Sequence, residues 1–259
     1  MQTLRVGSAG AFVRQWETFL CGQDLLADKE VDTKFTEESA EATRNFQIRH
    51  GLGIDGVAGN QTIGFAMAQL GFEVLPLSSE DYPPKPRSAK SLNFAKRQEL
   101  FGKIEFEAAG TKSNPEAIKI TNDWAKKNLT SVVIPQLKGV YGAPASGKIW
   151  VNAAIRDQTK ALFQAWEDAG LIDRVLSWGG SYNPRFIRGS RTTLSNHAHG
   201  TAIDLNVPWN GLGCRPALVG EKGSVRELVD LAWEHGWFWG GWYSKRKDGM
   251  HLEACRIVV

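Results

Sequence analysis

Residues 195–204 read Ser-Asn-His-Ala-His-Gly-Thr-Ala-Ile-Asp, and residues 248–253 read Asp-Gly-Met-His-Leu-Glu. Within these stretches, His197, His251 and Asp204 would supply two imidazole nitrogens and one carboxylate oxygen. Three protein ligands of this kind, with a fourth position left for water, are typical of a catalytic zinc site. Asp248 precedes the last of them by three residues and is placed to accept a proton from that water. The pattern predicts a zinc site split between two segments.

The spacing of these residues predicts strands rather than a helix. His197 and Asp204 are seven residues apart, which does not suit one helix face but suits a loop followed by a strand. Residues 201–207 are β-like, and Ala202, Asp204 and Asn206 share one face of that strand. A buried carboxylate on this face requires a charged partner or a metal. The alternation over residues 250–259 predicts a second strand.

The rest of the C-terminal part predicts an α+β domain with an antiparallel sheet. Helical spacing covers Leu92–Phe106, residues 149–169 and Glu221–His235. Leu171–Ser177 predicts a short strand. Residues 110–148 are rich in Gly, Pro and Lys and fit none of these elements.

The N-terminal part predicts a small all-α module of three helices over residues 1–72. Helical spacing is carried by Val13, Trp16, Phe19 and Leu20 and again by Ala42 and Phe46, and a third helix is expected over Asn60–Leu70. A glycine-rich turn, residues 51–59, precedes that third helix. Prolines and serines crowd residues 73–90, which predicts a semi-rigid linker before a domain at 91–259.

Composition narrows the class of protein. The net charge of +3 is too small to indicate a nucleic-acid partner. No apolar run approaches the roughly 18–20 residues of a membrane helix, and the first residues lack the layout of a secretory signal. We therefore expect synthesis in a cytoplasm, no stable membrane insertion and a monomer. Cys21, Cys214 and Cys255 form no CxxC pair, and a bridge between the last two stays open.

The N-terminal module resembles the PG-binding-1 family of peptidoglycan-binding modules. Trp16 is a departure, because the family usually has Gln there. The resemblance implies peptidoglycan as the partner. The matching residues are Leu4 to Gly10, Val13, Trp16 to Leu20, Val31-Asp32, Phe35-Thr36, Ala42, Phe46-Gln47, Gly51-Leu52, Ile54 to Gly59 and Thr62.

The C-terminal stretches resemble the M15 peptidases, which include D-Ala-D-Ala dipeptidases and carboxypeptidases and phage L-alanyl-D-glutamate endopeptidases. The family pattern S-x-H-x-x-G-x-A-x-D is met by Ser195, His197, Gly200, Ala202 and Asp204. Its second pattern, an acid three residues before a histidine, is met by Asp248 and His251. The resemblance implies Zn²⁺ bound by His197, Asp204 and His251, with Asp248 as general base. An aspartate at the base position favours the endolysin branch of the family.

Further residues are expected around the site. Arg185 is the candidate for stabilising an oxyanion or binding a substrate carboxylate, with Arg188 and Arg191 as competitors. We assign substrate binding to Ser195, and also to Trp239 and Trp242, because aromatic walls suit polymer binding. Two further residues of the same stretches are not expected to bind the metal. His199 is expected outside the ligand set, and Glu253 is expected to orient His251.

The prediction is a phage endolysin that docks on peptidoglycan and cuts a stem-peptide bond by zinc-activated water, most simply L-Ala-D-Glu. A bond next to diaminopimelate stays open. One alternative is a D-Ala-D-Ala-type carboxypeptidase in bacterial wall remodelling, and another is a non-catalytic wall-binding virion protein. An endolysin would be made in the host cytoplasm and would reach the periplasm and wall through holin-type membrane lesions.

Overall fold

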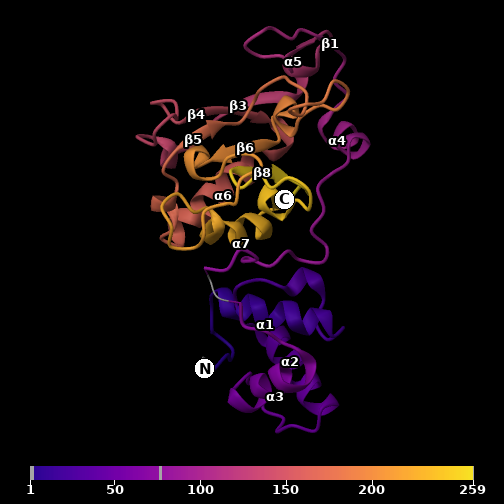
Figure 1. Cartoon of the computed structure of the whole chain (residues 1–259), viewed down its shortest axis with the longest axis vertical. Helices are drawn as coiled ribbons and strands as arrows, with labels where there is room; N and C mark the ends of the chain where they lie inside the picture. Colours follow the sequence, from indigo (N-terminus) through magenta and orange to yellow (C-terminus); the bar gives the residue numbers. More distant parts are fainter. Residues whose placement is uncertain (1–2, 76–77, 259) are drawn as a thin grey trace. The chain divides into compact units, whose positions relative to one another are not determined.

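The computed structural model describes residues 3–75 and 78–258, and the chain divides into two compact units, Met1–Ala89 and Lys90–Val259 (Figure 1). In the described ranges, helices are either too short or too polar to cross a bilayer. The first unit is helical and the second combines helices with small antiparallel sheets. The predicted fold class, a small all-α module followed by an α+β domain, is therefore confirmed.

Among its described residues, the first unit has three α-helices: α1 (Ala11–Gly22), α2 (Glu37–Arg49) and α3 (Asn60–Leu70). Trp16 of α1 is fully buried at the centre of the unit. Its indole nitrogen donates a hydrogen bond to Thr43 Oγ1 of α2 at 3.1 Å, and its ring meets Phe46 and Phe72 edge-on. A buried indole that keeps a partner for its N–H contributes apolar contact without an unpaired donor. The departure from the family pattern is thus accommodated as a core residue.

The glycine-rich turn between α2 and α3 is held by Gln47. The side-chain nitrogen of Gln47 donates to Asp55 Oδ1 at 2.7 Å, and its side-chain oxygen accepts from the backbone N–H groups of Asp55 and Gly56 at 3.0 Å. Gly56 has a φ of 72°, which a side chain rarely tolerates. One buried amide therefore fixes the turn that starts α3.

The segment after α3, expected to be a linker, begins and ends with bonds to α1. The side chain of Gln15 exchanges two hydrogen bonds of 3.0 Å with the backbone of Leu75, and Arg87 donates to the carbonyl of Gly22 at 3.5 Å. Its described residues contain no helix or strand. The division between the two units falls at Ala89 and Lys90.

The second unit contains four helices and eight strands among its described residues. The helices are α4 (Phe94–Phe101), α5 (Trp124–Asn128), α6 (Arg156–Asp168) and α7 (Arg226–Glu234). Two hairpin-like pairs come first, β1 (Phe106–Ala108) with β2 (Ile118–Ile120), and β3 (Leu129–Val133) with β4 (Lys148–Asn152). The largest sheet has the order β5-β6-β8-β7, formed by Trp178–Gly180, Ala202–Leu205, His251–Ala254 and Trp237–Trp239.

Every pairing in the largest sheet is antiparallel, and the register decides where the site lies. Asp204 of β6 stands directly opposite His251 of β8, and Ala202 stands opposite Glu253. Helices α6 and α7 pack on each other, and α7 also packs on the edge strand β7 (Figure 1). The sheet therefore holds the two sequence motifs on neighbouring strands above a packed helical layer.

Several predicted elements differ from those observed. The expected helix over residues 149–169 is instead strand β4, a 3₁₀ turn (Ala153–Ile155) and then α6. Leu171–Ser177 is not a strand: it contains a 3₁₀ turn, Ile172–Arg174, and β5 begins only at Trp178. The helix prediction was wrong for residues 149–152 because Ile149 and Val151 alternate inward with period two, just before the helical period of α6 begins.

Candidate metal centre and catalytic cleft

The metal-ligand candidates are delivered by two neighbouring strands and one short turn. His197 lies on the 3₁₀ turn Asn196–His199, and its backbone N–H donates to the Ser195 hydroxyl, which caps the turn, at 3.3 Å. Gly200 follows with a φ of 64°, and a Cβ there would come within 2.9 Å of the backbone nitrogen of Asn152. Only glycine fits this close approach without strain. The chain can therefore turn directly from His197 into β6 and Asp204.

The three candidate ligands converge as a triangle. His197 Nε2 lies 3.2 Å from His251 Nδ1 and 3.2 Å from Asp204 Oδ2, and His251 Nδ1 lies 3.0 Å from Asp204 Oδ1. Zn²⁺ binds nitrogen and oxygen at roughly 2.0–2.2 Å in tetrahedral geometry, which places two ligands about 3.3–3.5 Å apart. The separations are slightly shorter than that, and the donor set of two imidazoles and a carboxylate suits zinc. The residues present fit the metal implied by the sequence.

The second nitrogen of each ring is engaged, which points the first one at the metal position. His197 Nδ1 donates to the carbonyl oxygen of Ser181 at 2.8 Å. His251 Nε2 lies 3.3 Å from Glu253 Oε2, as expected for the residue that orients this ring. Such outer contacts fix the tautomer and leave the remaining lone pair for a metal.

Without a metal, the two histidines stabilise the charged form of Asp204, and Asp204 stabilises that of His251. Burial alone would raise the pKa of Asp204, but His197 and His251 lower it far below its usual range. Burial alone would lower the pKa of His251, but hydrogen bonds with Asp204 and Glu253 raise it to about 10. A metal that binds His251 must displace this proton, because only the neutral ring offers its lone pair.

A buried polar network lies behind His251, and the sequence analysis missed most of it. Glu253 is 1% exposed and accepts hydrogen bonds from the Tyr243 hydroxyl at 2.9 Å and from the side-chain amide of Asn196. Arg97 of α4 is 3% exposed and donates to Asn196 Oδ1 at 2.8 Å, so its charge lies close to Glu253. Arg97 precedes Asn196 by 99 residues, and no local sequence signal links it to the site. Only tertiary packing brings it there.

Asp248 stands beside the triangle with an uncommitted oxygen. Its backbone N–H donates to the carbonyl of Gly240 at 3.0 Å, and its own carbonyl accepts from the N–H of His251 at 3.1 Å, which fixes the turn. Its Oδ1 is buried and makes no hydrogen bond with the described residues. Burial raises the pKa of Asp248, an effect that the charge of His251 partly opposes. A buried carboxylate with a free lone pair and a raised pKa is suited to accept a proton.

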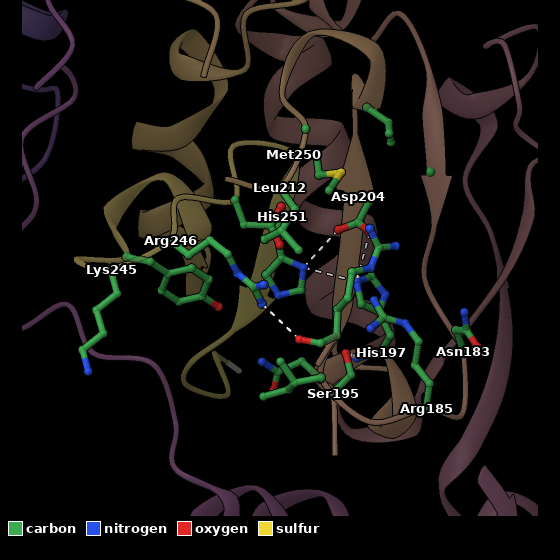
Figure 2. A pocket seen from close by; sticks show the side chains of 18 of the residues that line it. Asn183, Arg185, Ser195, His197, Asp204, Leu212, Lys245, Arg246, Met250 and His251 are labelled. Atoms are coloured by element: carbon green, nitrogen blue, oxygen red, sulfur yellow. Dashed lines mark hydrogen bonds and ion pairs between the residues drawn. The ribbon is translucent and has the colours of Figure 1, made fainter. Parts of the chain in front are cut away.

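These groups lie in a cleft of about 700 Å³ (Figure 2). Ser195, His197, Asp204, Asp248 and His251 all line it. Of the three arginines considered from sequence, Arg185 and Arg188 line the cleft as well. Arg191 instead donates to the carbonyl oxygen of Pro115 and is not among the lining residues. The structure therefore brings together the predicted ligands, the predicted base and the predicted arginine.

Trp239 and Trp242 do not line the cleft, and the structure does not support the prediction that they contact substrate. Trp239 is 2% exposed, and its indole nitrogen donates to the carbonyl of Gly249 at 2.8 Å. Trp242 is 8% exposed and meets Trp239 edge-on. Trp239 thus supports the loop that carries Asp248 from the core, and Trp242 packs against Trp239. The sequence could not distinguish this position from an aromatic wall.

The other histidine of the motif also takes a core position. His199 is fully buried and meets the rings of Phe94 and Trp124 edge-on. Burial and the charge of Arg97 lower its pKa to about 4, so it is a neutral packing residue. It lies outside the ligand group, as expected. All three cysteines are free, and no bridge joins Cys214 to Cys255.

Comparison with known families agrees with both halves of this description. Residues 12–65 match the family model described as a putative peptidoglycan binding domain, and residues 188–254 match the model described as D-alanyl-D-alanine carboxypeptidase. No curated protein matches the chain. The chain therefore carries a peptidoglycan-binding domain of the first family followed by an M15 peptidase domain, and the two together support a wall-binding peptidase.

Proposed function

We propose that this chain is a zinc-dependent endopeptidase that binds peptidoglycan and hydrolyses the L-Ala-D-Glu bond of its stem peptides, as a phage endolysin. The observation that carries the proposal is the triangle of His197, Asp204 and His251 beside the uncommitted oxygen of Asp248. A site built only for structure would have closed its fourth position with a protein group. His197, Asp204 and His251 all line the cleft, so a metal held by them would be accessible to substrate.

The reaction divides between the metal and the side chains of the cleft. A zinc ion held by the three ligands would lower the pKa of a water molecule towards about 7 and polarise the scissile carbonyl. Asp248 takes the proton from the attacking water at Oδ1 and returns it to the leaving amine. Arg185, half-buried in the wall, supplies a cation for the negative charge that develops on the carbonyl oxygen. Ser195 caps the turn that holds His197 and faces the same cleft.

The endolysin role draws support from the joining of a wall-binding domain to a peptidase domain in one chain. The binding domain raises the local concentration of the peptidase at an insoluble polymer. In this role the chain acts as a monomer, is made in the host cytoplasm and reaches the wall through holin-type membrane lesions.

A D-Ala-D-Ala-type carboxypeptidase is the second candidate, and it is favoured by the description of the family that residues 188–254 match. The two proposed activities would use the same metal, base and cleft. They differ only in which peptide bond is positioned for hydrolysis.

Digestion of diaminopimelate-type peptidoglycan, with and without a chelator, separates the candidates by the mass of the released peptides. A new D-Glu amino terminus that disappears with chelator supports the endopeptidase. Release of only a terminal D-Ala supports the carboxypeptidase. Absence of any cleavage by zinc-loaded protein contradicts both and returns the chain to a wall-binding role.

A further inference from the structure

Cations crowd the walls of the cleft beyond those that the proposed reaction uses. Arg185, Arg188, Lys245 and Arg246 all line it, whereas Asp204 and Asp248 are its only lining carboxylates among the described residues. None of the four cations forms an ion pair with a described residue. A cleft with one sign of charge and low-dielectric walls concentrates ligands of the opposite sign.

The two carboxylates do not offset these cations. Asp204 is committed to the ligand triangle with His197 and His251. Asp248 lies within the field of Arg185, which lowers the pKa that burial and Asp204 raise. A zinc ion would add further positive charge at the base of the cleft. Arg188, Lys245 and Arg246 are therefore left without an anionic partner among residues 3–75 and 78–258.

Arg246 and Arg188 belong to one wall, built where two loops meet. Nη2 of Arg246 donates to the backbone carbonyl oxygen of Arg188 at 3.2 Å, which links the loop after Trp242 to the loop before Ser195. The aliphatic part of Arg246 lies near Gly213, 3.7 Å from where a Cβ would be. In Figure 2, Arg246 reaches towards the ligands from one segment and Arg185 from another, whereas the amine of Lys245 points away from them.

This arrangement suits a carboxylate. A guanidinium presents five N–H donors in a planar fork, and the carbonyl of Arg188 occupies only one donor nitrogen of Arg246. The remaining donors lie on the cleft wall, together with the exposed side chain of Arg188. A carboxylate bound there would gain charge-assisted hydrogen bonds that a neutral amide of the same shape cannot match.

We infer that Arg188 and Arg246 form an anion subsite that receives a free carboxylate of the substrate peptide beside the bond being cut. The inference rests on the proposed hydrolysis of stem peptides. In such a peptide D-glutamate continues the chain through its side-chain carboxyl, so its α-carboxyl group is either free or amidated. The subsite makes the enzyme selective for the stem peptide with the free α-carboxylate over the same peptide with an α-carboxamide.

The test compares two soluble tetrapeptides that differ only at this group, D-isoglutamate or D-isoglutamine. The zinc-loaded full chain is expected to cleave the carboxylate peptide with a kcat/KM about tenfold higher, because charged hydrogen bonds are stronger than neutral ones but solvent screens an exposed wall. The double variant Arg188→Gln, Arg246→Gln is expected to reduce this preference to within about twofold by slowing the carboxylate peptide alone. Arg246→Lys should retain part of it.

Arg156→Gln is the matched control, since it removes one exposed cation from α6 that is paired with Asp157 and lies outside the cleft. It should leave the preference unchanged. Equilibrium binding of both peptides to the zinc-loaded Asp248→Asn chain gives a second readout. It does not depend on turnover.

The outcomes separate the subsite from the reaction. Cleavage of both peptides at equal rates, or a preference that survives the double variant, overturns the subsite and leaves the proposed function intact. Cleavage of neither peptide, with binding that favours the carboxylate through the two arginines, overturns the proposed function and keeps the subsite. Neither cleavage nor selective binding overturns both.

Discussion

Replacement of Asp248 by asparagine removes one proton acceptor and changes almost nothing else. The amide has the shape of the carboxylate, and the Oδ1 it replaces makes no hydrogen bond with the described residues. The backbone bonds that link residue 248 to Gly240 and His251 remain. A positioned general base contributes about 10²–10⁴-fold to a rate. At about 1.36 kcal/mol for each factor of ten, the variant should raise the barrier by about 3–5 kcal/mol.

The Asp248→Asn variant should lose activity but keep its metal binding and its stability. The ligand triangle of His197, Asp204 and His251 excludes Asp248, so zinc content should stay at that of the unmodified protein. Burial raises the pKa of Asp248 in the folded chain, and a carboxyl group with a raised folded pKa costs stability as pH rises through its titration. The neutral asparagine should therefore be at least as stable at pH 7.

The assay combines kcat/KM on a soluble stem peptide, zinc content by atomic emission and the midpoint of thermal unfolding. Asp157→Asn is the matched control, because it makes the same chemical change at an exposed position of α6. A rate within tenfold of the unmodified protein at full zinc content would refute the role of Asp248 as the base. Loss of zinc would instead place Asp248 among the ligands.

Three other perturbations test the surroundings of the site. Since metal must displace a proton that His251 holds up to a pH of about 10, apparent zinc affinity should rise about tenfold per pH unit between about pH 6 and 9; competition with a chromophoric chelator measures it, and a flat profile contradicts the shift. Arg97→Met removes the buried donor to Asn196 Oδ1 and one of two cations near Glu253, the other being His251, and should destabilise the fold by about 1–3 kcal/mol, with partial recovery in Arg97→Lys, as read from thermal unfolding. An unchanged midpoint would show that this pairing contributes nothing. Gly240→Ala places a Cβ 2.4 Å from the carbonyl oxygen of Asp248, so the turn must shift; lower kcat/KM with normal folding is expected, and unchanged kcat/KM would mean that the turn tolerates the shift.

The parts of the site that could be predicted are those with a local signature. His197, Asp204 and His251 stand at fixed spacings in two short stretches, and the alternation around Asp204 identifies its strand as β6. The register that sets Asp204 opposite His251 is a property of the sheet, but two ligands of one metal must meet, so their convergence followed from the chemistry.

The parts that could not be predicted depend on contacts between distant segments. Arg97 lies on α4, and nothing in its neighbourhood indicates a partner at Glu253. Trp239 carries the aromatic character of a binding wall, and only its burial shows that it belongs to the core. Strand β4 was hidden because its five residues run directly into the periodic pattern of α6.

The register between β6 and β8 has a topological consequence. A metal shared by Asp204 and His251 ties together two positions 47 residues apart and closes the intervening chain into a loop. By the chain-entropy reasoning used for cross-links, closing a loop of this length is worth about 4 kcal/mol. The loop contains helix α7, Asp248 and Arg246. One bound ion would therefore restrict the positions of both the proton acceptor and the cationic wall. Removal of the metal by a chelator would then loosen the chain between β6 and β8, and a protease would cut this segment first.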